Sequence, residues 1–141
     1  MNVTVEASRS SPQAIWFRRV MWTGIVANFL MSLPCLIDPA WSIALMQMPP
    51  ATPLMWPRFS AQLVLLLTLF YIPGANDPFR YRANAWLAVF SRLAGVIFFT
   101  SLTLFSSERE YWLFGAFDFA FLVPQFLLLR QLPSVDGDRR W

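Results

Sequence analysis

The chain lacks the residues on which most catalytic and metal-binding sites depend. Histidine and lysine are absent from its 141 residues, and cysteine occurs once, at Cys35. Without histidine the chain cannot ligate haem or copper through imidazole. A single thiol allows neither an intrachain disulfide nor a redox dithiol, and no glycine-rich phosphate loop is present. The sequence therefore predicts no metal site and no intrinsic cofactor, and it favours a non-catalytic role.

Charged side chains are also scarce. They make up 13% of the chain, whereas hydrophobic residues make up 57%. A soluble domain of this size needs more polar surface, so the composition indicates an exterior that faces lipid. All eleven basic residues are arginines that flank apolar blocks, and none of them forms a dense run. We therefore expect membrane lipids as partners and no nucleic acid.

Four apolar blocks are long enough, or nearly so, to cross a hydrocarbon core of about 30 Å. We expect spans at 20–37, at 59–72 with a continuation toward 75, at 84–105 and at 111–129. The proline-rich but apolar segment between the first two spans predicts a short interfacial helix at 40–48. The predicted fold is an all-α integral membrane protein, a four-transmembrane-helix bundle over 15–132. A flexible tail at 1–14 and a second tail at 133–141, both cytoplasmic, flank it.

Arginine is distributed unevenly between the two ends of the predicted bundle. If both tails and the turn at Asp77 share one side, that side holds eight arginines, the other holds Arg58 and Arg109, and Arg92 lies within a span. The positive-inside rule then places both termini in the cytoplasm of a bacterium, with the protein in its inner membrane. Aromatic and basic residues at the span ends are the expected interfacial anchors, namely Trp16, Trp41, Trp56, Arg18, Arg19, Arg80, Arg82 and Arg130.

Three polar residues, Asn28, Arg92 and Asp118, fall inside predicted spans. Counted from the nearest cytoplasmic arginine at about 1.5 Å per residue, they lie about 13, 15 and 18 Å deep, close to one level. A charge at this depth costs roughly 3 kcal/mol. One interpretation is an internal Arg92–Asp118 ion pair beside Asn28 that fixes helix register. The alternatives are a site for a ligand, quinone or proton, and outward snorkelling or pairing with another subunit.

The third span also carries two small residues, Ser91 and Gly95, at small-xxx-small spacing. This spacing permits close approach of two helix backbones. We interpret it as internal packing in preference to a dimer motif.

Several of these segments together resemble the small four-helix DoxX-like membrane proteins. The resemblance covers roughly residues 15–132. It is carried by Trp56-Pro57-Arg58, by the turn from Asn76 to Arg82, by Arg92 with Gly95, and by Asp118. It implies a four-helix bundle of a kind discussed as the membrane subunit of quinone-linked oxidoreductases. No residue matches a known catalytic position, so the resemblance implies a fold and no chemistry.

The sequence supports two functional hypotheses. The first is a non-catalytic accessory or structural subunit of a larger inner-membrane complex, respiratory or photosynthetic. It rests on the missing redox ligands and on the aromatic content of 17%, because aromatic side chains are favoured at protein interfaces. The alternative is a DoxX-like membrane subunit that binds a quinone or another small hydrophobic ligand at the mid-membrane polar cluster. Contacts with quinone, pigment or lipid are therefore expected, and a transporter is less favoured because no inverted repeat is visible.

Overall fold

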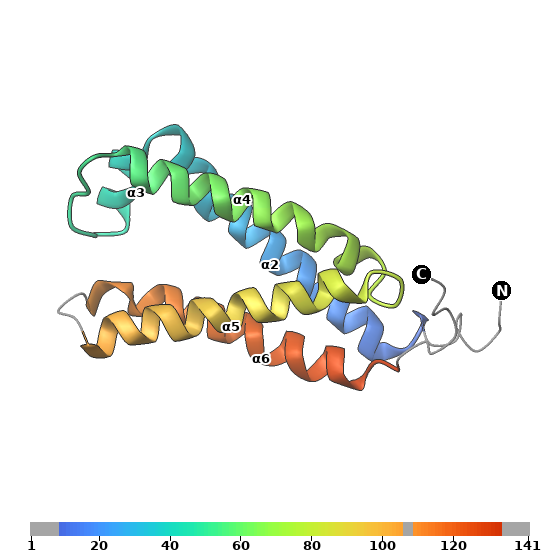
Figure 1. The fold of residues 1–141 in the computed structure, drawn as a ribbon. Helices are drawn as coiled ribbons and strands as arrows, with labels where there is room; N and C mark the ends of the chain where they lie inside the picture. Colours follow the sequence, from blue (N-terminus) through green and yellow to red (C-terminus); the bar gives the residue numbers. More distant parts are fainter. Residues whose placement is uncertain (1–8, 106–108, 134–141) are drawn as a thin grey trace.

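The computed structural model describes residues 9–105 and 109–133, and every regular element within them is helical (Figure 1). The elements are α2 (Pro12–Ile37), α3 (Pro39–Leu45), α4 (Met55–Asn76), α5 (Arg82–Phe105), the 3-10 turn η1 (Arg109–Tyr111) and α6 (Trp112–Gln131). Four of them, α2, α4, α5 and α6, are long and apolar enough to cross a membrane. The predicted four-helix membrane bundle with one short extra helix is therefore confirmed.

The four long helices form two closely packed pairs. Helix α2 packs mainly along α4, and α5 packs mainly along α6, while α2–α6 and α4–α5 contacts join the pairs. Since the chain alternates in direction, α2 begins and α6 ends at the same end of the bundle (Figure 1). We call this the arginine end, because Arg18, Arg19, Arg80, Arg82 and Arg130 belong to it, and we call the opposite end, where α3 lies, the α3 end.

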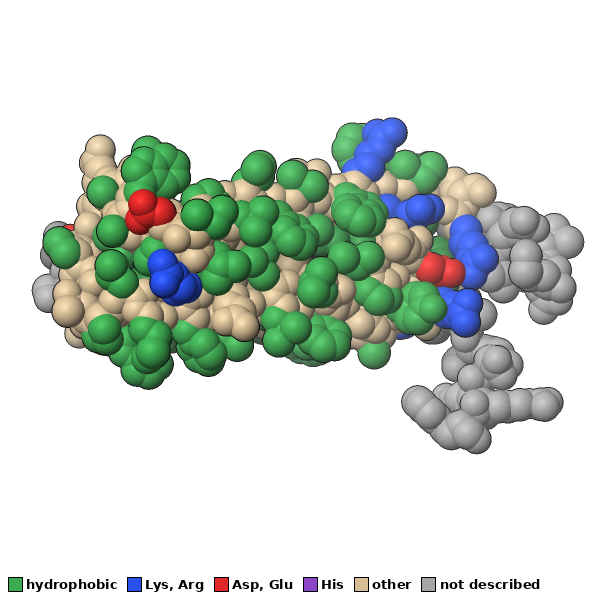
Figure 2. All heavy atoms as spheres, turned by 90° about the horizontal axis from the view of Figure 1, so that it is seen from above, with side chains coloured by type: hydrophobic (Ala, Val, Ile, Leu, Met, Phe, Trp, Pro, Cys, Tyr) green, Lys and Arg blue, Asp and Glu red, His purple; other side chains and the backbone are tan. Residues whose placement is uncertain are grey.

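The exterior of the bundle carries larger apolar side chains than its interior. Alanines fill much of the space between the helices, among them Ala14, Ala61, Ala75, Ala85 and Ala88. Large apolar side chains point outward, for example Leu30 at 69% exposure and Phe90 at 60%. Figure 2 shows hydrophobic side chains over the length of one face, with arginines gathered toward one end. Such a large apolar surface is unfavourable in water and suits contact with lipid.

The first helix begins earlier than the sequence predicted. The sequence predicted a flexible tail at 1–14 and a span that starts at residue 20. Instead, the helix starts at Pro12. Proline is tolerated at the first helical position, where its missing N–H has no helical partner. The Ala14 N–H donates to the Ser11 side chain, 3.3 Å away, which caps the helix. Residues 1–8 and 134–141 of the expected tails, and 106–108 of the expected hairpin, lie outside the described residues.

The second span is also longer than predicted. Helix α4 begins at Met55, four residues before the predicted start at 59, and it continues through Pro73 to Asn76, close to the predicted continuation toward 75. The short helix occupies Pro39–Leu45, earlier than the predicted 40–48, because the Asp38 carboxylate accepts a hydrogen bond from the Trp41 N–H at 3.0 Å. It ends before Gln47, whose φ of 56° is left-handed and interrupts a right-handed helix.

Candidate functional site

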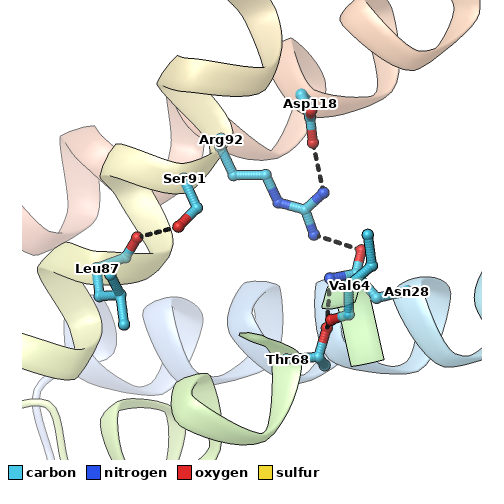
Figure 3. A network of polar contacts seen from close by, with 7 residues as sticks. All are labelled: Asn28, Val64, Thr68, Leu87, Ser91, Arg92 and Asp118. Atoms are coloured by element: carbon cyan, nitrogen blue, oxygen red, sulfur yellow. Dashed lines mark hydrogen bonds and ion pairs between the residues drawn. The ribbon is translucent and has the colours of Figure 1, made fainter. Parts of the chain in front are cut away.

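Each of the four long helices contributes one residue to a polar cluster inside the bundle. We define the polar cluster as Asn28 of α2, Thr68 of α4, Arg92 of α5 and Asp118 of α6 (Figure 3). Arg92 Nη1 donates to Asp118 Oδ1 at 2.6 Å, and Arg92 Nη2 donates to Asn28 Oδ1 at 2.9 Å. Asn28 Nδ2 then donates to Thr68 Oγ1 at 2.8 Å. One chain of hydrogen bonds thus connects all four helices.

Because the polar cluster is buried, each of its polar groups needs a partner within the protein. Arg92 is only 5% exposed, Asn28 7% and Thr68 is fully buried. An isolated charge in this position would be costly, whereas an opposite charge in direct contact compensates most of that cost. The hydroxyl of Thr68 also donates to the Val64 carbonyl at 2.7 Å, so it accepts from Asn28 while its own proton is satisfied.

Two aromatic rings of α6 lie next to the guanidinium of Arg92. The Arg92 Cζ atom lies 5.0 Å from the ring centre of Phe117 and 5.1 Å from that of Phe121. A cation over an aromatic face gains about 2 kcal/mol or more when it is removed from water. A Cβ on Gly24 of α2 would lie 3.3 Å from Phe121 and 3.4 Å from Arg92 Nη2, so glycine there leaves space for this arrangement.

The structure brings together the three residues that the sequence singled out, Asn28, Arg92 and Asp118. Arg92 points into the bundle toward Asp118 and Asn28, so it neither snorkels nor faces another subunit (Figure 3). Thr68 was missed, because a threonine in an apolar span has no distinguishing signal when it can bond its own i−4 carbonyl. Gly95 packs within the protein, against Asp118, as the small-residue spacing predicted.

A cavity of about 640 Å³ lies between the two helix pairs, and it begins at the polar cluster. Asn28, Arg92 and Asp118 line its inner part, and Tyr71 and Ser91 add hydroxyl groups. On α2 its wall follows one helical face from Asn28 to Cys35, a distance of about 10 Å along the axis. The cavity therefore extends from the middle of the bundle toward the α3 end.

The remaining wall of the cavity is largely apolar and strongly aromatic. Trp56 of α4 contributes to it, together with four phenylalanines and a tyrosine. These are Phe98, Phe99, Phe114, Phe117 and Tyr111. Phe99 stacks on Phe114, with ring centres 5.2 Å apart, and lies nearly parallel to Tyr111, at 6.4 Å and 14°. At the α3 end, side chains from α3 and the following segment cover the cavity, namely Ile43, Met46, Met48, Pro49 and Ala51.

The predicted interfacial anchors lie at the two ends of the bundle. Trp16 is exposed at the arginine end, where Arg19 lies over its ring at 5.3 Å. Trp41 and Trp56 are exposed at the α3 end, at 55% and 58%. The basic anchors are also at the surface, with Arg18, Arg80 and Arg130 exposed and Arg82 half-buried. These positions are the ones that aromatic and basic residues occupy at membrane interfaces.

Arginines at the arginine end also connect neighbouring helices. Arg82 at the start of α5 donates to the carbonyls of Leu132 and Pro133 just after α6, both at 3.1 Å. Arg9 forms an exposed ion pair with Asp77 at 2.6 Å, next to the α4–α5 turn. These contacts hold the arginine end together, in contrast to the α3 end, where the cavity separates the helix pairs.

Within residues 9–105 and 109–133, no group of three or more histidine, cysteine or acidic side chains is placed to hold a metal ion.

Comparisons with protein-family models, with curated proteins and with solved structures found no match for this chain. The resemblance to the DoxX-like proteins thus stays a prediction from the motif residues. The function is therefore argued from the polar cluster and the cavity.

Proposed function

We propose that this chain is a multi-pass membrane protein that binds a small, largely apolar molecule between its two helix pairs. One observation carries the proposal: a cavity of about 640 Å³ combines an apolar wall with a buried polar cluster at its inner end. Ligand sites in proteins usually have this size and this combination, with a few polar groups that fix the orientation of the ligand. The sequence raised the same hypothesis, in which Asn28, Arg92 and Asp118 lie at a similar depth in the membrane and form a ligand site.

Packing supports an occupant in this space. Protein interiors are close-packed, and few of their voids exceed the size of a water molecule. Side chains of the four helices leave a much larger volume here, and the cavity opens to the exterior beside exposed Ser60 and Phe98. In a membrane such a space is filled by a bound molecule or by lipid. A molecule with a polar group suits the inner end better than an alkyl chain, because a hydrocarbon would leave the donors of the cluster unused.

We place the protein in the bacterial inner membrane with its arginine end in the cytoplasm. The positive-inside rule supports this orientation, since Arg18, Arg19, Arg80, Arg82 and Arg130 share that end. The α3 end then lies at the opposite membrane surface. A ligand would reach the cavity from the outer half of the membrane, past α3.

The accessory-subunit hypothesis rests on a different feature, the exposed aromatic surface. Phe90, Phe105 and Trp112 are exposed at 60%, 88% and 56%. Lipid accounts for such side chains as well as a partner subunit does, so the surface favours neither. Isolation in a mild detergent, followed by mass spectrometry of retained proteins, distinguishes the two hypotheses. A stoichiometric membrane partner would support the accessory role, and a monomer that retains a small molecule would support ligand binding.

Photolabelling with adamantane diazirine, a compact apolar probe, tests the proposal directly. We expect labelling of Phe117 and Met31, which line the cavity, in addition to lipid-facing Phe90. The matched control is Ser60→Trp, which adds a large side chain to the cavity wall at a position that is otherwise exposed. Labelling of Phe117 and Met31 should fall in this variant while that of Phe90 stays constant. Labelling of Phe90 alone, or no effect of Ser60→Trp, would contradict the proposal.

A further inference from the structure

The charges around the cavity determine the charge of its ligand. Among the described residues that line it, only Arg92 and Asp118 are charged, and they form an ion pair with each other at 2.6 Å. An anionic ligand at the remaining N–H groups of Arg92, or a cationic one at the remaining oxygen of Asp118, would add a charge that the balanced pair cannot neutralise. A net charge inside the bundle is unfavourable, because burial penalises a charge that has no partner. The cavity thus favours an uncharged molecule.

The hydrogen bonds of the cluster determine the polar group of the ligand. Both ends of the Asn28 amide are engaged, with Oδ1 accepting from Arg92 and Nδ2 donating to Thr68. One oxygen of Asp118 accepts from Arg92, and the other lies against Gly95. A guanidinium has five N–H groups, of which two serve the contacts with Asp118 and Asn28. The cluster therefore offers three N–H donors of Arg92 against one carboxylate oxygen that is packed on the Gly95 backbone, so the best-matched ligand group is an acceptor.

The wall determines the shape of the ligand body. The stacked rings of Phe99, Phe114 and Tyr111 lie on one side of the cavity, and Trp56 and Phe98 add further aromatic surface. Flat rings stack on such surfaces at little cost in conformational entropy, and aromatic pairs contribute more than the burial of their area alone. A flexible alkyl chain gains no such contact and loses rotamer freedom when it is bound.

We propose that the ligand is an uncharged, ring-containing molecule with a hydrogen-bond acceptor, such as a carbonyl oxygen, directed at Arg92. The ring occupies the aromatic part of the cavity toward the α3 end. This inference rests on the proposed function and narrows the ligand class. It disfavours fatty acids and other charged lipids, which an apolar cavity of this volume would otherwise admit.

Four related compounds separate the three parts of this inference. 2-Acetylnaphthalene is an uncharged ring compound with an acceptor, and 2-naphthoate is a ring compound of similar size that is anionic at pH 8. 2-Ethylnaphthalene lacks the acceptor, and undecan-2-one lacks the ring. Each is tested in nanodiscs for protection of Phe117 from the diazirine probe. We expect 2-acetylnaphthalene to give half-protection at a concentration about tenfold lower than 2-ethylnaphthalene, because a hydrogen bond to a charged donor contributes at least this much. It should also protect at a lower concentration than 2-naphthoate, whose charge has no partner in the cavity, and than undecan-2-one, which cannot stack on the aromatic wall.

Each result that departs from this expectation refutes a different part of the inference. Equal protection by 2-naphthoate would refute an uncharged ligand, equal protection by 2-ethylnaphthalene would refute the contact with Arg92, and equal protection by undecan-2-one would refute the ring. In these three cases the compounds still compete for the cavity, so the proposed function stands. If the probe never reaches Phe117, the proposed function itself fails. Because the same protein is used throughout, no variant has to fold.

Discussion

The carboxylate of Asp118 lies directly against the backbone of Gly95 on the neighbouring helix. A Cβ built on Gly95 would overlap with Oδ2 of Asp118 and would lie 2.9 Å from its Cγ. Asp118 is held at the same time by Arg92, at 2.6 Å. The carboxylate therefore cannot move away from α5 without disturbing the ion pair. The missing side chain of Gly95 thus allows the polar cluster and the α5–α6 packing to coexist.

Replacing Gly95 by alanine should destabilise the protein. The added methyl group forces either Asp118 or helix α6 to shift, and overpacking of this kind costs about 1–3 kcal/mol. We expect Gly95→Ala to lower the thermal unfolding midpoint in detergent. The matched control is Ser101→Ala on the exposed part of the same helix, where the hydroxyl only bonds the Ile97 carbonyl. Equal midpoints for the two variants would show that Asp118 does not need this space.

The Arg92–Asp118 pair should behave as a unit in a double-mutant cycle. Arg92→Met or Asp118→Leu alone leaves one unpaired charge in the bundle, which costs about 3–5 kcal/mol. The double variant removes both charges and should be more stable than either single variant. The free energies of unfolding in mixed micelles measure this coupling.

The exposed pair of Arg9 and Asp77 is the control for that cycle. Its side chains are 42% and 23% exposed, so water already solvates both charges. Arg9→Gln should change the free energy of unfolding by about 1 kcal/mol at most. If the Arg92 and Asp118 substitutions were additive and similarly small, the pair would be hydrated and the cluster would not hold the helices together.

The four spans could be predicted because the bilayer sets both their length and their composition. Arg92 and Asp118 could be predicted as a cluster, since charges inside apolar blocks stand out and helix geometry fixes their depth. The span boundaries were less accurate, because α2 begins at Pro12 instead of residue 20 and α4 begins at Met55 instead of residue 59. Pro12 lies in the first helical turn, where its missing N–H has no helical partner.

The cavity and Thr68 could not be predicted from the sequence. Thr68 differs from other threonines only in its position opposite Asn28, which depends on how α2 packs on α4. The cavity depends on the spacing of two helix pairs, a tertiary property that the hydrophobic pattern of one helix does not encode. Its lining comes from five helices, η1 and a loop.

Arg58 should stabilise the α3 end by capping a helix that precedes it in the chain. Its Nε and Nη2 atoms donate to the carbonyls of Leu36 and Ile37, at 3.1 and 3.3 Å, in the last turn of α2. These carbonyls have no partners within the helix, and a cation near them also interacts favourably with the helix dipole. Arg58→Met should cost about 1 kcal/mol, seen as a lower unfolding midpoint. Arg130→Met, in the last turn of α6, is the control because it removes the same dipole interaction without the two hydrogen bonds of Arg58, and it should have a smaller effect.

The orientation of the bundle can be tested with single engineered cysteines. We expect Thr52→Cys, at the α3 end, to react with a membrane-impermeant maleimide in intact spheroplasts. Asn76→Cys, at the arginine end, should react only after lysis. The physical reason is that arginine-rich segments are retained in the cytoplasm during insertion. Both positions are exposed, so burial does not limit the reaction.

The Cys35→Ser parent gives the background for this experiment, because Cys35 is the only native cysteine. Labelling of Asn76→Cys before lysis, with Thr52→Cys protected, would reverse the orientation and place the α3 end of the cavity on the cytoplasmic side. Labelling of both positions before lysis would mean that α4 does not cross the membrane, since Thr52 precedes α4 and Asn76 is its last residue. The ligand would then have to enter through a different route, because α3 and Trp56 would no longer mark the outer surface.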